Sequence, residues 1–244
     1  MKTKHVSNLK TARTDWTPEG LGLDPARYRA VINYLFDRPV PEGQMQEWYW
    51  DDDLEVFIAT SLEWTRFQTA IFANAAVDLG DFNDEQVGMG LNYLVDSGKS
   101  DVPFAAIETS VPLDEAMQMM QAMKRLWRDC IGPRMSSVHA PIGSGAGGRL
   151  GYVCHMWFDL WPTFYSVQNI PAWGDAVWDV LSDMLTVPCR AVQIAALHGI
   201  GHEVNRLDRQ EVIDAKVLAF VASLNGADAE LRSYAEAARV GNVQ

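Results

Sequence analysis

Cysteine is scarce in this sequence, and no two cysteines are close together. The chain of 244 residues contains three, Cys130, Cys154 and Cys189, and none of them forms a C-x-x-C pair. An odd number of widely spaced cysteines argues against a disulfide framework and against a structural zinc knuckle. We therefore expect reduced, partly buried thiols and a cytoplasmic location.

Long apolar runs are also missing. No stretch approaches the ~18 uncharged apolar residues that a membrane-spanning helix needs. The basic opening segment, MKTKHVSNLKTARTDW, is not followed by an apolar stretch, so we expect neither a membrane span nor a secretory signal. Apolar residues still make up 48% of the chain, which is enough to bury a globular core.

Positive charge is in deficit. The chain has 20 Lys and Arg against 32 Asp and Glu, for a formal net charge of -12. Phosphate binding needs a basic surface, so this balance argues against nucleic acid and anionic membranes as general partners. The deficit is concentrated in residues 15–115, which hold 20 acidic and 5 basic side chains. A basic protein partner suits such a surface.

The densest acidic cluster is EWYWDDDLE, residues 47–55. Aromatic side chains beside carboxylates are typical of binding hot spots, and three adjacent aromatics cannot all face one core. This pattern predicts a partner-binding set made of Glu47, Trp48, Trp50, Asp51, Asp52, Asp53 and Glu55. The alternative is a solvated helix N-terminus, in which the acids face the positive end of the helix dipole and one tryptophan is in the core.

Convincing strands are absent, and helical periodicity dominates. The segment DPARYRAVINYLFDRP predicts a first helix with Asp24 as N-cap and Pro25 at the first helical position. Residues 51–80 predict one long helix that begins with the acidic run and ends at Gly80. In total about nine helices joined by short turns predict an all-α fold, an irregular α-solenoid of the HEAT or armadillo kind. An irregular helical bundle is the competing interpretation.

A single Gly/Ser-rich tract, SSVHAPIGSGAGGRLGY, divides the chain. We expect an acidic N-terminal helical region at 1–135, a linker or loop at 136–150, and a C-terminal helical stack at 151–244. The glycines of 143–148 could cradle a phosphate at a helix N-terminus. Neither the Walker G-K-[ST] element nor a preceding strand is present, which favours a plain loop.

Two histidines lie one helical turn apart in AALHGIGHEVNRLD, at positions 198 and 202, and HMWFD places His155 and Asp159 at the same spacing. If the two helices face each other, three imidazoles and a carboxylate could bind zinc or iron. The H-E-x-x-H motif is absent, because Gly199 follows the first histidine. Alternatively, small residues around His198 and His202 allow close helix packing, and the histidines are buried hydrogen-bonding groups. The sequence favours this second interpretation, so we predict no metal, no cofactor and no catalytic residue.

The segments VCHMWFDLWP and VLSDMLTVPCRAVQIAALHGIGH resemble a set of uncharacterised bacterial proteins that have an ALHGLGH-type stretch after a Trp-rich helix. The resemblance covers about residues 150–220. It implies a HEAT-like helical fold and no particular activity.

Charge, aromatics and the lack of a catalytic set together predict a non-enzymatic binding protein. The specific expectation is a bacterial protein of the immunity or antitoxin type, which neutralises a basic partner through its acidic N-terminal half. Two alternatives stay open. One is a metal-binding protein or metal-dependent enzyme that uses His155, His198 and His202, and the other is a general helical-repeat scaffold.

Overall fold

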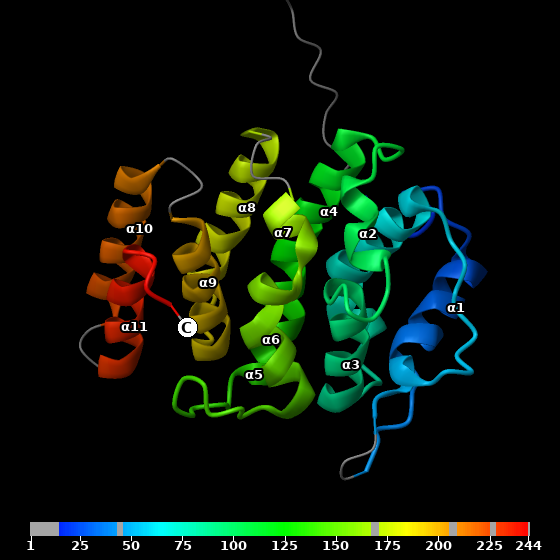
Figure 1. Cartoon of the computed structure of the whole chain (residues 1–244), viewed down its shortest axis with the longest axis horizontal. Helices are drawn as coiled ribbons and strands as arrows, with labels where there is room; N and C mark the ends of the chain where they lie inside the picture. The colour runs from blue at the N-terminus through cyan, green and yellow to red at the C-terminus, as the bar shows by residue number, and fades with distance from the viewer. Residues whose placement is uncertain (1–14, 43–45, 167–170, 205–208, 225–227, 244) are drawn as a thin grey trace, which may run out of the picture.

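The computed structural model describes residues 15–42, 46–166, 171–204, 209–224 and 228–243, with the side chains of residues 165 and 166 excepted. Within these ranges the protein is helical and contains no strand, which confirms the predicted all-α class. Figure 1 shows the helices side by side in a row, from α1 at one end to α10 and α11 at the other. This arrangement is compatible with an irregular α-solenoid. None of the described helices is long and apolar enough to cross a bilayer.

Nine helices of eleven or more residues lie in the described part of the chain, as the sequence predicted. Their bounds are α1 Pro25–Phe36, α2 Ser61–Asp78, α3 Asp84–Val95, α4 Leu113–Arg125, α6 Gly148–Leu160, α8 Pro171–Met184, α9 Arg190–Glu203, α10 Gln210–Ser223 and α11 Ala229–Arg239. Shorter elements fill the connections: η1 Trp48–Trp50, η2 Val102–Ile107, the π-helical turn η3 Leu126–Ile131, α5 Gly132–Met135 and α7 Pro162–Ser166.

The first helix begins where its capping residues predict. The Asp24 side chain accepts a hydrogen bond from the backbone N–H of Arg27 at 2.8 Å, and Pro25 is the first helical residue. A proline costs nothing at this position, since its missing N–H would have no partner within the helix.

The second helix begins ten residues later than predicted. Residues 51–60 are a turn followed by chain without regular secondary structure, and α2 starts at Ser61 after a capping box between Thr60 and Glu63. Two reciprocal hydrogen bonds in this box satisfy backbone N–H groups at the helix start. The prediction of a helix that starts at Asp51 is therefore wrong, and the acidic run does not face the dipole of α2.

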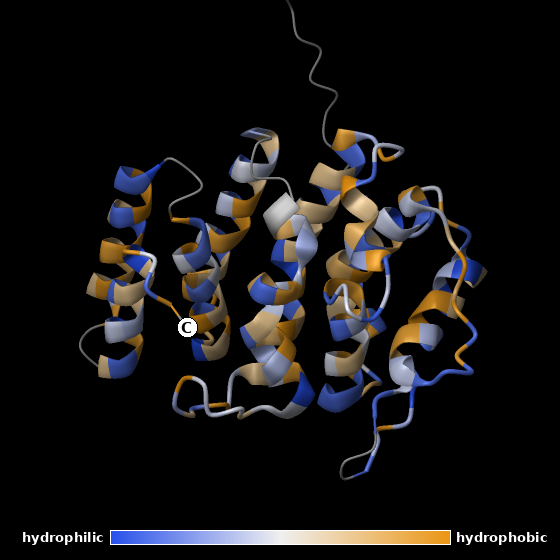
Figure 2. Ribbon diagram, viewed as in Figure 1, coloured by the Kyte–Doolittle hydropathy of each residue, from blue (hydrophilic) through white to orange (hydrophobic). Residues whose placement is uncertain are grey.

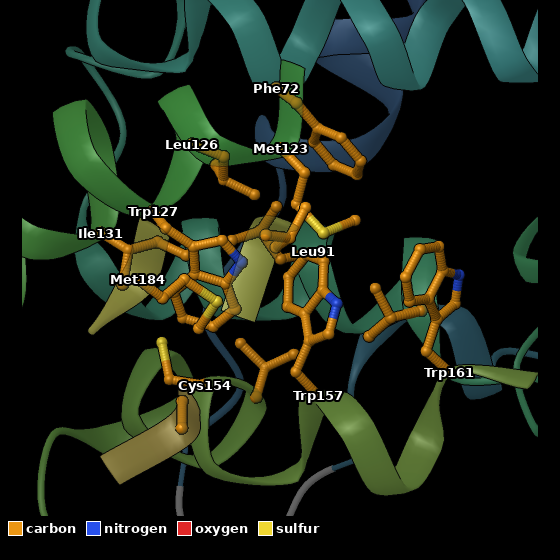
Figure 3. Packing of buried hydrophobic residues seen from close by; sticks show 14 of the residues in the cluster. Phe72, Leu91, Met123, Leu126, Trp127, Ile131, Cys154, Trp157, Trp161 and Met184 are labelled. Atoms are coloured by element: carbon orange, nitrogen blue, oxygen red, sulfur yellow. The ribbon is translucent and has the colours of Figure 1, made fainter. Parts of the chain in front are cut away.

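Tryptophans hold the middle of the row together. Trp127 from η3 and Trp157 from α6 are fully buried, and their rings meet edge to face with centroids 5.1 Å apart. Figure 3 shows both rings among aliphatic and sulfur-containing side chains from neighbouring elements. Figure 2 shows orange, apolar faces turned toward adjacent helices and blue, polar faces turned outward. The core runs continuously through the row, because α6 packs against α3 on one side and α9 on the other.

The Gly/Ser-rich tract is a loop between α5 and α6 that is tied to the C-terminal helices. The Arg190 guanidinium donates to the carbonyl oxygen of Ala140 at 2.7 Å, and the backbone N–H of Ile142 donates to the Glu230 carboxylate at 3.1 Å. Gly147 precedes α6 with φ at 92°, a left-handed conformation that favours glycine. Helices from before and after the loop pack against each other, as α3 with α6 shows.

The three thiols should be unreactive in the folded protein. Cys130, Cys154 and Cys189 are free and buried, and burial raises the pKa of the Cys130 and Cys154 thiols. The thiolate is the reactive form, so a raised pKa and a closed surface both slow modification. With an aromatic disulfide reagent at pH 8, we expect almost no reaction in buffer and three equivalents in guanidinium chloride. Rapid modification of a native thiol would contradict this burial.

Candidate functional site

A cluster of three potential metal ligands lies where the last turns of α6 and α9 meet. Asp159 comes from α6, and His198 and His202 come from α9. The His198 Nε2 lies 2.8 Å from Asp159 Oδ2, and the His202 Nε2 lies 2.7 Å from Asp159 Oδ1 and 3.1 Å from His198 Nε2. One ligand atom from each residue fits within 4.8 Å of the others. We name these three residues the Asp–His cluster.

Tyr234 of α11 supports the cluster from behind. Its hydroxyl lies 2.7 Å from His198 Nδ1, so both ring nitrogens of His198 have polar partners. Burial lowers the pKa of His198 against the opposing effect of Asp159, and burial beside Asp159 raises the pKa of Tyr234 to about 12. At neutral pH this pair is therefore an uncharged imidazole next to a protonated phenol, and a neutral imidazole is the form that binds metal.

His155 lies beside the cluster without joining it. Its ring centroid is 5.1 Å from that of His198, but the ligand atoms that converge belong to Asp159, His198 and His202. Of the three imidazoles that the sequence brought together, the structure places two in the cluster and the third next to it. Within the described ranges, the His155 ring nitrogens have no hydrogen-bond partner.

Small residues bring α9 close enough to its neighbours for this arrangement. A Cβ atom on Gly199 would lie 2.6 Å from Leu181 Cδ2 and 2.9 Å from the Phe158 ring. On Gly201 it would lie 2.5 Å from a methyl group of Val243. The expectation of close packing around the two histidines is confirmed, although side chains rather than backbone fill the space. Glycine here removes the atoms that would push α9 away from α6 and α8.

The cluster can hold a metal ion and leave coordination positions open. One ligand atom from each residue lies within 4.8 Å of the others, and adjacent ligand atoms of a tetrahedral site with bonds of about 2.0–2.2 Å lie about 3.3–3.6 Å apart. The Asp159 carboxylate meets the two imidazoles through different oxygens, Oδ2 at His198 and Oδ1 at His202, so metal binding would shift the side chains from these hydrogen-bonded positions. The His198 side chain is 2% exposed, whereas those of Asp159 and His202 are 25% and 28% exposed. One side of the cluster therefore faces solvent, where water or a substrate can complete the coordination.

The acidic cluster of residues 47–55 lies at the other end of the row, before α2. Asp51, Asp52, Asp53 and Glu55 are all exposed, as the partner-binding prediction requires. Glu47 is half-buried and forms an ion pair with Arg149 at 3.2 Å. Its carboxylate is therefore already partnered within the chain, so it is less free to meet another protein than the four exposed acids.

The two tryptophans of this region have different surroundings. The Trp48 ring is half-buried and packs edge to face on Tyr34, with the Arg38 guanidinium 4.6 Å from its centroid. Trp50 is 43% exposed, and the Lys99 ammonium lies 3.6 Å from its ring. Trp50 is therefore the ring that a partner can reach.

Comparison of the chain with protein-family models, with curated proteins and with solved structures finds no match. The resemblance of residues 150–220 to HEAT-like proteins therefore stays a prediction. Any function must be inferred from the geometry of the site.

Proposed function

We propose that this protein binds one divalent transition-metal ion through Asp159, His198 and His202, and acts on a ligand at the open coordination positions. The observation that carries this proposal is the convergence of two imidazole Nε2 atoms and a carboxylate within 4.8 Å. Two histidines and one carboxylate on one face of a metal are the ligand set of many non-haem iron enzymes, and a similar set binds catalytic zinc.

The hydrogen bond behind His198 supports a metal site as well. A histidine that binds metal through one ring nitrogen almost always donates the other N–H to an oxygen. In this protein the Tyr234 hydroxyl lies 2.7 Å from Nδ1 and can accept that N–H. With the proton on Nδ1, Nε2 would offer its lone pair to a metal ion held with Asp159 and His202.

Metal content should therefore depend on the cluster. Protein purified without a polyhistidine tag is expected to hold one zinc or iron ion per chain, measured by elemental analysis. Asp159→Asn and His198→Ala should each lower the affinity by at least about 100-fold, because each removes a ligand. Tyr234→Phe removes only the supporting oxygen and should cost about 10–100-fold.

His139→Ala is the matched control, since His139 is an exposed histidine of the α5–α6 loop and is not one of the three converging ligands. Its metal content should equal that of the original chain. If no variant or control holds metal, the cluster is a hydrogen-bonded structural group. In that case His198→Ala should still lower the free energy of unfolding by about 1–3 kcal/mol, as loss of a buried hydrogen-bonding partner does.

A second candidate function is the binding of a basic protein, as an immunity or antitoxin-like protein would. The specific observation is the exposed segment that follows Trp50. It holds Asp51, Asp52, Asp53 and Glu55 close to two exposed apolar side chains, since Val56 and Ile58 are 59% and 83% exposed. Exposed apolar groups beside carboxylates are typical of a protein-binding surface. The carboxylates attract a basic partner, and the apolar side chains are buried in the contact with it. Three buried, unpaired cysteines support a cytosolic setting for this role.

Charge on this segment should control the rate of association with the partner. Changing Asp51, Asp52 and Asp53 together to Asn should slow association and weaken its salt dependence, because long-range attraction is screened over ~10 Å at 0.1 M salt. The melting temperature should change little, since exposed charges add little to stability. Surface-based kinetics at two salt concentrations would measure both. Unchanged association would remove the acidic segment from the interface.

A further inference from the structure

A cavity of about 240 Å³ lies between α6, the first half of α9 and the α5–α6 loop, which forms part of its wall. Its walls are mainly aliphatic or sulfur-containing, with Val138, Ile142, Met156, Ala191 and Ile194 among them. For scale, an apolar cavity of about 150 Å³ holds one benzene molecule. The present cavity is therefore large enough for an apolar group of about ten non-hydrogen atoms.

Helical spacing places this cavity next to the Asp–His cluster. On α6, His155 lines the cavity, and Asp159 follows it by one turn. On α9, Ile194 lines the cavity, and His198 follows it by one turn. Four residues of helix span ~6 Å. The cavity and the Asp–His cluster are therefore neighbours on the same two helices, with His155 between them.

His155 is the polar group at the junction of the cavity and the cluster. It belongs to the cavity wall, and its ring lies 5.1 Å from the ring of His198. Since its ring nitrogens have no partner in the described residues, they are free to bond a polar group of a ligand. By contrast, the Arg190 guanidinium, which also lines the wall, is held by Asp228, Glu230 and the carbonyl oxygen of Ala140.

We infer that this cavity holds the apolar body of the ligand on which the metal acts, and that the ligand is an apolar molecule of about ten non-hydrogen atoms with one polar, metal-binding end. The apolar part fills the cavity, and the polar end meets His155 and the open metal positions. This inference rests on the proposed metal site. The existence of an apolar binding cavity does not, so the two can fail separately.

The test uses two probe series, one that binds metal and one that does not. Straight-chain hydroxamic acids of two to ten carbons are titrated into zinc-loaded protein, and straight-chain alcohols of the same lengths into metal-free protein. In both series, affinity should rise about fourfold for each added methylene group. It should level off at about eight carbons, when the cavity is full.

Ala191→Leu fills part of the cavity and should end the rise about three carbons earlier in both series. Ala237→Leu, at a half-buried alanine of α11 that is not part of the cavity wall, is the matched control and should behave like the original chain. A thermal melt of each variant checks folding, and the series on the original chain are decisive without the variants.

The outcomes separate the two proposals. Hydroxamic acids that bind zinc-loaded protein with no dependence on chain length would overturn the cavity inference and keep the metal site. Alcohols that show the rise in a protein that does not bind zinc would overturn the metal site and keep the apolar cavity.

Discussion

Replacing Trp157 with alanine is expected to lower the free energy of unfolding by about 3–5 kcal/mol, as such truncations of buried aromatic residues do. Trp157 is fully buried between three neighbours, because its ring packs on Trp127, Phe72 and Trp161 with centroid distances of 5.1, 6.0 and 6.4 Å. Alanine would leave a cavity at the point where α6 meets the preceding helices. Chemical denaturation followed by circular dichroism measures the loss.

Two controls separate packing from other effects. Within the described residues, the Trp157 indole N–H has no hydrogen-bond acceptor, so Trp157→Phe removes volume but no hydrogen bond and should cost about 1–2 kcal/mol. Trp50→Ala removes a ring that is 43% exposed and should cost about 1 kcal/mol or less. A loss of less than about 1 kcal/mol for Trp157→Ala would mean that this ring does not organise the core.

The second large effect is expected at Gly88 in α3. A Cβ atom at this position would lie 2.4 Å from both the backbone carbon of Arg149 and the backbone nitrogen of Leu150. Backbone atoms at the start of α6 cannot move aside as a flexible side chain can, so α3 and α6 must separate. Overpacking of this kind typically costs about 1–3 kcal/mol. We expect Gly88→Ala to destabilise by that amount, although alanine favours a helix by about 1 kcal/mol over glycine.

Gly80→Ala is the matched control for this prediction. Gly80 follows α2, and its added Cβ atom would lie 3.2 Å from the carbonyl oxygen of Val77, with no other helix nearby. The same change should therefore have a small effect there, within about 0.5 kcal/mol. Thermal melts of the two variants, run together, compare one chemical change in two surroundings. Equal melting temperatures would contradict the close approach of α3 and α6.

Local sequence signals predicted most of the helices. Asp24 and Pro25 marked the start of α1, and helical periodicity found the nine long helices. The start of α2 was missed, although its capping box, Thr60 with Glu63, is visible in the sequence. The prediction placed the helix start at the acidic run, because acidic residues are common in the first turn of a helix. Val56 and Ile58 argue against a helix at this point, since β-branched residues favour extended chain.

Local sequence patterns predicted only part of the candidate site. Spacing of one turn predicted that His198 and His202 share a face, and the same spacing suggested Asp159 as a companion of His155. Only the packing of α6 against α9 decides that Asp159, rather than His155, reaches the two imidazoles. Tyr234 lies 36 residues after His198 and carries no motif, so its role depends entirely on how α11 docks on α9.

The packing of Val243 against Gly201 has a practical consequence. This contact holds Val243 against α9, immediately before His202, and Figure 1 shows the described segment after α11 running back toward that helix. A purification tag fused there would emerge next to the Asp–His cluster at millimolar effective concentration. A polyhistidine tag would then offer its own imidazoles to any ion in the cluster and distort every measured stoichiometry. Fusions for metal work on this protein therefore need a cleavage site that removes them.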